Sequence, residues 1–180
     1  MAGRLFAVVG PSGAGKDTLM AAAGARRPDL VLARRVITRP ADAGGEAFDG
    51  VTEAEFLKRR DAGDFALWWQ AHGLYYGIPA SIDRALAEGR DVVFNGSRAV
   101  LAAAVARYPQ MAVLLVTASA EVLAERLAAR GRESAGEIAA RLGRAGFALP
   151  KGVEAREIRN DGALGNAVAA MLAALQPERA

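Results

Sequence analysis

The sequence predicts an α/β fold with a mainly parallel sheet flanked by helices. Three observations lead to this fold class. Short apolar runs alternate with helical stretches along the chain. The first run, residues 4–9, is apolar almost throughout, as in a strand buried on both faces. It leads directly into a glycine-rich loop and an Ala-rich stretch. No linker or repeat divides the 180 residues, so we expect one domain spanning 1–180.

Five further β-prone runs bounded by turn residues predict the remaining strands. They are residues 30–38, 65–71, 91–95, 111–118 and 154–158. The segment 72–77, "HGLYYG", is bounded by glycines and predicts a turn. Trp68 and Trp69 are neighbours on one strand, so we expect their side chains to point to opposite faces, one of them into the core.

Helical stretches lie between the strands, and several carry start or stop signals. They are residues 17–25, 52–60, 78–88, a stretch from Ser119 that ends before Gly131, a stretch after Ser134, and 165–176. Thr52 with Glu55, and Ser134 with Glu137, form capping boxes. Gly89 is a suitable residue to follow a helix C-terminus. The sequence "NDG" at 160–162 predicts a turn rather than a ligand site.

The composition, 52% hydrophobic and 24% charged, is that of an ordinary globular protein. The chain has no cysteine, which excludes disulfides, thiolate metal sites and cysteine nucleophiles. The apolar stretch near the start, residues 5–9, is too short for a signal-peptide core, and no run approaches the length of a membrane span. We therefore expect a cytoplasmic protein without a membrane partner.

The net charge of +3 raises the question of a nucleic-acid partner. Arginine supplies 20 of the 23 basic residues, so a single arginine carries little information. Spaced zinc ligands and the aromatic segments of RNA-binding domains are missing. We expect no nucleic-acid partner. The three lysines are more informative, because one of them, Lys16, lies in the glycine-rich loop.

The loop after the first strand carries the most specific motif of the chain. Gly10, Gly15 and Lys16 fit the phosphate-binding pattern G-x-x-x-x-G-K. Glycines let backbone N–H groups turn toward phosphates, and the following helix presents its N-terminus to the anion. Lys16 would reach the β- and γ-phosphates of ATP. The residues assigned to nucleotide binding are Gly10, Pro11, Ser12, Gly13, Ala14, Gly15, Lys16, Asp17 and Thr18.

The loop departs from its pattern at Asp17, where a serine or threonine normally helps to hold Mg²⁺. A carboxylate beside a triphosphate is repelled unless a cation lies between them. Because Mg²⁺ favours carboxylates together with phosphates, we assign Asp17 and Thr18 as metal ligands, directly or through water. The alternative is that Asp17 is an acidic residue favoured by the dipole of the first helical turn.

The order of motifs resembles that of guanylate-kinase-like proteins. The matching segments are residues 8–19, 34–40, 72–79, 125–134 and 140–142. The resemblance covers nearly the whole chain. It implies a P-loop, nucleoside-monophosphate-kinase-like fold with an acceptor-binding insert at about 34–80 and a lid at about 126–145. It also implies that Arg39 and Tyr76 hold the phosphate of the acceptor, with Arg35 as a helper.

The groups with which guanylate kinases read guanine are missing. By that resemblance, Leu67 stands in place of a glutamate, Ile78 in place of a hydroxyl residue and Asn95 in place of an aspartate. A purine site built on hydrogen bonds depends on such polar groups for discrimination. The substitutions point to a phosphorylated acceptor without guanine.

One branch of these proteins, the ribose 1,5-bisphosphate phosphokinases, is similar in detail. The shared text is "GKD", Gly44-Gly45-Glu46, "HGLYYG" and "FNGSR". The resemblance implies that the γ-phosphoryl group of ATP passes, with Mg²⁺, to the 1-phosphate of ribose 1,5-bisphosphate, giving phosphoribosyl diphosphate. It also implies a role in bacterial phosphonate breakdown. The residues assigned to this phosphorylated sugar are Arg35, Arg39, Tyr76, Asn95 and Arg98.

Such a reaction needs no general base, because the attacking oxygen belongs to a phosphate that is already ionised. We accordingly expect the single histidine, His72, to have a structural role in its turn rather than a catalytic one. Catalysis would come from alignment and charge neutralisation by Mg²⁺, Lys16, loop N–H groups and lid arginines. The resemblance favours Arg130 and Arg141 as those arginines, with Arg126, Arg132 and Arg144 in support.

Two other functions compete with this one. The first is a nucleoside monophosphate kinase that uses other base contacts. The second is a guanylate-kinase-like module that binds proteins and has no activity. The intact loop glycines and Lys16 argue against the module, which has no need of a phosphate cradle. The sequence gives no indication of oligomeric state.

Overall fold

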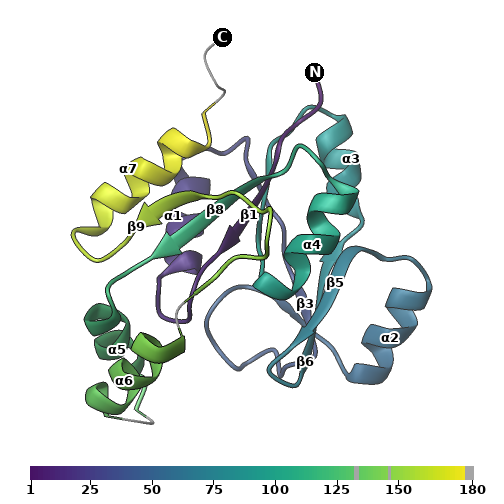
Figure 1. Cartoon of the computed structure of the whole chain (residues 1–180). Coiled ribbons are helices and arrows are strands. Elements are labelled where there is room, and N and C mark those ends of the chain that lie inside the picture. The colour runs from purple at the N-terminus through teal and green to yellow at the C-terminus, as the bar shows by residue number, and fades with distance from the viewer. Residues whose placement is uncertain (132–133, 146, 177–180) are drawn as a thin grey trace.

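The computed structural model describes residues 1–131, 134–145 and 147–176, and it contains two sheets (Figure 1). The strands are β1 Leu5–Val9, β2 Val31–Leu32, β3 Val36–Ile37, β4 Asp49–Gly50, β5 Phe65–Ala71, β6 Leu74–Pro79, β7 Val92–Asn95, β8 Ala112–Thr117 and β9 Arg156–Arg159. The helices are α1 Lys16–Arg26, α2 Glu53–Asp61, α3 Ser81–Ala87, α4 Arg98–Arg107, α5 Ala120–Ala128, α6 Ala135–Ala145 and α7 Leu164–Ala174.

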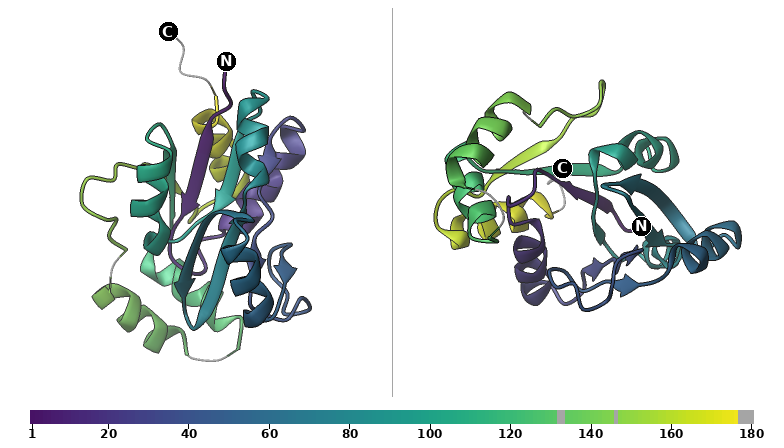
Figure 2. Two further views of the ribbon diagram at one scale, coloured as in Figure 1. Left: turned by 90° about the vertical axis from the view of Figure 1, so that its right-hand side faces the viewer. Right: turned by 90° about the horizontal axis from the view of Figure 1, so that it is seen from below.

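The larger sheet is parallel and has the strand order β2-β7-β1-β8-β9. Helices cover both of its faces, as Figures 1 and 2 show. Phe6 and Val8 of β1 pack with residues of α1 and α7, whereas the alternate residues of β1 pack in a second cluster with α3 and α4. This arrangement confirms the predicted α/β class and explains why the first strand is apolar at every position.

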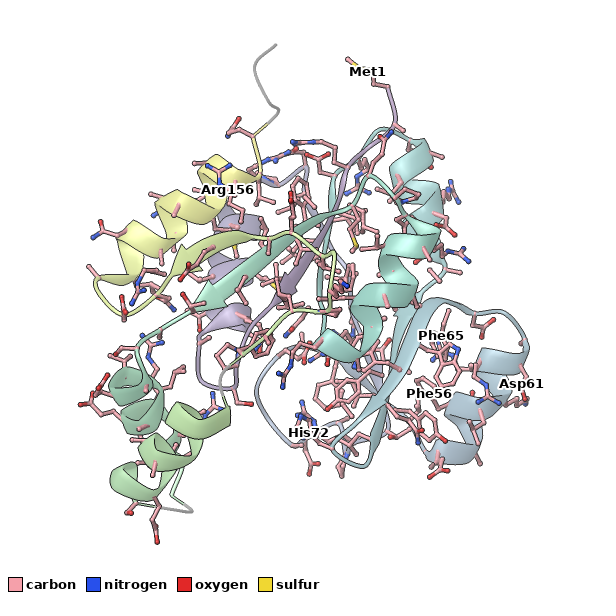
Figure 3. All side chains as sticks on the ribbon, viewed as in Figure 1. Met1, Phe56, Asp61, Phe65, His72 and Arg156 are labelled. Carbon is pink, nitrogen blue, oxygen red and sulfur yellow. The ribbon has the colours of Figure 1, made fainter. Side chains whose placement is uncertain are left out.

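The smaller sheet has the order β4-β3-β6-β5 and is built from residues 36–79. This stretch lies within the insert predicted at about 34–80. The β5–β6 hairpin turns at His72 and Gly73, whose φ angles are 53° and 74°. Positive φ at two successive residues is the geometry of a tight hairpin turn. Figure 3 shows His72 at this tip and Phe56 of α2 facing Phe65 of β5; their ring centroids are 4.6 Å apart.

Three predicted boundaries are wrong. The run 30–38 is not one strand, because β2 pairs with β7 in the larger sheet and β3 pairs with β6 in the smaller one. The turn predicted at 72–77 is confined to its first two residues, and the rest belongs to β6. The helix predicted over 78–88 therefore starts only at Ser81. The other predicted strands and helices are confirmed within a few residues.

Helix caps account for several of these boundaries. Ser119 accepts a hydrogen bond from the Val122 N–H at the start of α5. Ser134 and Glu137 form the full reciprocal capping box before α6. Gly89, with φ 82°, follows α3 as expected. None of the helices within the described residues has the length and apolar character needed to span a bilayer.

The carboxyl ends of β1, β7, β8 and β9 meet at one edge of the larger sheet. Figure 1 shows α5 and α6 on one side of this edge and the smaller sheet on the other. Ligands of open α/β sheets bind outside the carboxyl ends of the strands. The fold therefore places the glycine-rich loop between two flanking units.

The opposite end of the sheet is closed by an ion-pair cluster. Arg4 donates to the Asp91 carboxylate and to the Leu175 carbonyl oxygen after α7. Arg27 donates to the same carbonyl at 3.1 Å. Burial would raise the pKa of Asp91, but hydrogen bonds from the Arg4 side chain and backbone bring that pKa below its usual value. The cluster thus ties β1, β7 and the end of α7 together.

We predict that Asp91→Asn lowers the free energy of unfolding at pH 7 by roughly 1–3 kcal/mol, because it leaves buried donors less well paired. The folded-state pKa is depressed, so the stabilisation is present above the unfolded pKa of about 4 and is lost as the pH falls through the folded value. Urea denaturation at several pH values measures this. Asp29→Asn, at an exposed partner of Arg27, is the control; an equal loss for both variants would contradict the account.

Candidate active site

The loop from Gly10 to Gly15 joins β1 to α1 and can only be built from glycine at two points. A Cβ on Gly10 would lie 2.2 Å from the Val116 carbonyl oxygen of β8. Gly15 caps α1 with φ 88°, and a Cβ there would lie 2.5 Å from the Asn160 Nδ2. The loop therefore runs tightly against the strands on its far side. The predicted strand–loop–helix arrangement is confirmed.

Arg126 and Asn160 hold the loop from outside. Arg126, on α5, donates from Nη1 to the Gly13 carbonyl oxygen at 3.1 Å and from Nη2 to the Asn160 carbonyl oxygen at 2.6 Å. Asn160 donates from Nδ2 to the Ala14 carbonyl oxygen at 2.8 Å. These bonds satisfy loop carbonyls and so fix the orientation of the loop peptides.

Both residues have roles that the sequence did not predict. Arg126 was assigned to support catalysis from the lid, but in this structure its guanidinium binds loop carbonyls. The side chain of Asn160 is buried rather than part of a simple exposed turn. The available signal was its position, since it is a polar residue directly after a buried parallel strand.

A pocket of about 280 Å³ opens between this loop, α5 and the segment after β9. It is lined by Gly13, Gly15, Thr18, Arg126, Arg130, Asn160, Gly162 and Leu164. Arg130 is solvent-exposed, so its charge is available to a ligand. The pocket combines a glycine loop, a helix N-terminus and arginines, which suits a polyphosphate.

Lys16 bends back onto the loop and donates to the carbonyl oxygens of Gly10 at 2.8 Å and Pro11 at 3.2 Å. Burial lowers the pKa of Lys16 to about 8; the charge of Asp17 opposes this effect, whereas those of Arg35 and Arg130 add to it. Predicted site residues from three separate segments, represented by Asp17, Arg35 and Arg130, thus lie close enough to affect the ammonium group of Lys16. An anionic ligand would stabilise its charged form.

Asp17 is exposed in the first turn of α1, next to the equally exposed Thr18. The buried side chain of Asn95, at the end of β7, donates from Nδ2 to the Asp17 Oδ1 at 2.6 Å. One carboxylate oxygen is therefore held in place while the side chain faces solvent. A single carboxylate beside a phosphate loop fits Mg²⁺, which binds one or two carboxylates together with substrate phosphates.

Arg35 is buried and forms an ion pair with Glu46, to which its Nε donates at 2.9 Å. Its guanidinium also lies 5.0 Å from the ring centroid of Tyr76. Burial lowers the pKa of Arg35 to about 10, an effect opposed by Asp17 and Tyr76 and increased by Arg39. The sequence shows Glu46 only as part of the Gly44-Gly45-Glu46 motif, and it does not predict the pairing of Glu46 with Arg35.

Arg39 keeps donor capacity on the side of the smaller sheet. Its Nη2 donates to the Gly44 carbonyl oxygen at 3.2 Å, and its guanidinium lies 4.3 Å from the ring centroid of Phe48. Its Nε is buried and has no hydrogen-bond partner among the described residues. Tyr76 stacks on Trp69 at 5.3 Å, which orients the phenol ring near Arg35. As expected, Trp69 is buried, and Trp68 is exposed.

Leu67 and Ile78 are opposite each other in the β5–β6 pair and belong to the core. They are 5% and 0% exposed, so these positions offer no polar group to a nucleobase.

Arg98 begins α4, and its guanidinium lies 4.4 Å from the ring centroid of Phe147. This contact does not link Arg98 to the other residues assigned to the acceptor. Arg132 and the side chains of Arg141 and Arg144 lie outside the described residues.

Known proteins that are similar to this chain agree with one another. No family model matches it. The ribose 1,5-bisphosphate phosphokinase PhnN of Ruegeria sp. is 49% identical over 99% of this chain and 94% of its own length. The PhnN of Rhizobium etli is 48% identical over 96% and 89%. The chain belongs to the ribose 1,5-bisphosphate phosphokinase family.

The family also includes a fused form. A bifunctional ribose 1,5-bisphosphokinase-thymidine phosphorylase of Cupriavidus necator is 50% identical over 97% of this chain, which spans 29% of that protein. Among solved structures, a guanylate kinase of Anaplasma phagocytophilum has a TM-score of 0.68 at 16% identity, covering 97% of this chain and 85% of its own. This chain thus shares the fold of a guanylate kinase.

We predict that ATP affinity falls above about pH 8, by up to about tenfold per pH unit, because Lys16 must take up a proton to bind the phosphates. Titration calorimetry from pH 6 to 10 measures this dependence. Lys16→Arg should weaken binding but remove the slope, because arginine stays charged. A wild-type slope that persists in Lys16→Arg would contradict this assignment.

Proposed function

We propose that this protein transfers the γ-phosphoryl group of ATP to the 1-phosphate of ribose 1,5-bisphosphate, giving ADP and 5-phosphoribosyl 1-diphosphate. The observation that carries the proposal is the contrast between the two sides of the site. One side keeps the glycines and Lys16 of a phosphate-binding loop. The other keeps buried and half-buried arginines, while Leu67 and Ile78 belong to the core.

On the donor side, the loop 10–18 and Lys16 bind the phosphates of ATP. Asp17 and Thr18 would hold Mg²⁺, which when bound neutralises charge on the β- and γ-phosphates. Arg130 lines the pocket and lies near enough to Lys16 to affect its pKa. Arg130 and Arg141 would complete the neutralisation from the lid.

On the acceptor side, Arg39 and Tyr76 bind a phosphate of the sugar, with Arg35 as a helper and Asn95 and Arg98 as further contacts. Among the described residues Arg39 is bound to a carbonyl oxygen rather than to a carboxylate, which supports its part, since phosphate prefers charged donors. Arg35 already binds Glu46, so its help would come mainly from its charge. The residues align two anions and have no proton to remove.

The proposal includes a cytoplasmic location and a role in phosphonate breakdown, as the resemblance implies. The acceptor is a small phosphorylated sugar rather than a macromolecule. The loop glycines and the two arginines that line the described pocket are in keeping with the phosphates of ATP, the phosphoryl donor.

The test is ADP release with ribose 1,5-bisphosphate, GMP or AMP as the offered acceptor. We expect kcat/KM to be highest for ribose 1,5-bisphosphate, because Leu67 and Ile78 offer no hydrogen-bonding group at two of the positions where guanylate kinases read the base. A preference for GMP would contradict the proposal. ATP binding without transfer to any of the three would favour a non-catalytic module.

A second prediction concerns the acceptor pocket. Arg39→Ala should lower kcat/KM for ribose 1,5-bisphosphate about 10–100-fold, the loss expected for a charge-assisted contact, and should leave the Kd of ATP unchanged. Arg60→Ala is the matched control, because Arg60 stacks on the exposed Trp68 and has no assigned role. Equal acceptor kinetics in the two variants would place the phosphate elsewhere.

A further inference from the structure

Asp17 and Asn95 occupy two positions at which P-loop enzymes commonly hold Mg²⁺. The usual pair is a loop serine or threonine and an aspartate at the end of a neighbouring strand. In this chain the loop position is Asp17, and Asn95 ends β7, the neighbour of β1. The carboxylate is therefore on the loop, and the neutral side chain is on the strand.

The geometry joins the two positions directly. Asn95 is in register with Val8, two residues before the loop begins, and the Gly96 N–H donates to the Val8 carbonyl oxygen at 2.8 Å. This pairing fixes the end of β7 beside the start of α1. The Asn95 side chain, 5% exposed, bridges to the Asp17 Oδ1 at 2.6 Å.

We propose that the carboxylate and its neutral partner have exchanged places in this protein, and that Asn95 is a positioning residue for Asp17. The amide of Asn95 fixes one carboxylate oxygen and leaves the other for the cation or its water. This inference rests on the proposed function, because it assumes that Mg²⁺ binds to the protein together with ATP. The resemblance assigns Asn95 to binding of the sugar, and the positioning of Asp17 is an additional role.

The charges around Asp17 support the exchange. Asp17 is the acidic group that affects the pKa values of both Lys16 and Arg35. An aspartate at Asn95 in addition would place two carboxylates in contact, and such groups cannot readily both ionise. The surrounding charges are therefore consistent with a single carboxylate at this point, at either residue 17 or residue 95.

The experiment moves the carboxylate from residue 17 to residue 95 and measures ATP binding in the absence of the acceptor. Calorimetry gives the Kd of ATP with Mg²⁺ and with EDTA, and the ratio of the two is the Mg²⁺-dependent gain. We expect Asp17→Ser to lose about 10–100-fold of this gain, as for other metal-site residues. The double variant Asp17→Ser/Asn95→Asp should recover most of it, because it rebuilds the usual pair.

A matched control places the carboxylate at residue 97, two residues beyond Asn95. Ser97 caps α4 by accepting from the Ala99 N–H, and aspartate is an equally good cap. Asp17→Ser/Ser97→Asp restores the net charge of the wild type but should not recover the gain. Recovery in both double variants, or in neither, would overturn the exchange.

A double-mutant cycle tests the positioning role if the swapped protein does not fold. Asn95→Ala should reduce the Mg²⁺-dependent gain in the wild type and have no further effect on it in the Asp17→Ser background. Additive losses would overturn the inference. A wild-type protein that binds ATP equally well with Mg²⁺ and with EDTA would contradict the proposed use of Mg²⁺ itself, and the exchange with it.

Discussion

The tight path of the loop between β1 and α1 is the constraint on which the site depends. The loop passes so close to β8 and to Asn160 that only glycine fits at Gly10 and Gly15. Its carbonyls are held by Arg126 and Asn160, which come from two other elements. A loop held in this way presents its N–H groups without the entropic cost of ordering them at each binding event.

The same edge of the sheet concentrates positive charge that the protein neutralises only in part. Burial lowers the pKa of both Lys16 and Arg35, and each of these groups is affected by further arginines. Asp17 and Glu46 supply the nearby negative charge. Such a cluster is better matched by phosphates than by a neutral ligand, which connects the electrostatics of the fold with the transfer of a phosphoryl group between anions.

Much of this could be predicted from the sequence, because the signals are local. The apolar first strand, the glycines, Lys16 and the helix caps each depend on neighbours within a few positions. The missed contacts join distant segments: Asn160 lies 146 positions from Ala14, and Arg126 lies 113 from Gly13. The run 30–38 was misjudged for a similar reason, since its two halves find partners in different sheets.

Our central claim is that the glycine-rich loop binds the phosphates of a nucleotide, while the facing pocket binds a sugar phosphate without recognising a base. A crystal structure with ADP, Mg²⁺ and phosphoribosyl diphosphate tests it most directly. We expect Lys16 to leave the carbonyls of Gly10 and Pro11 for the phosphates of ADP, and Arg39 and Tyr76 to contact a phosphate of the sugar. Lys16 still bound to those carbonyls, or a sugar phosphate bound away from Arg39, would contradict it.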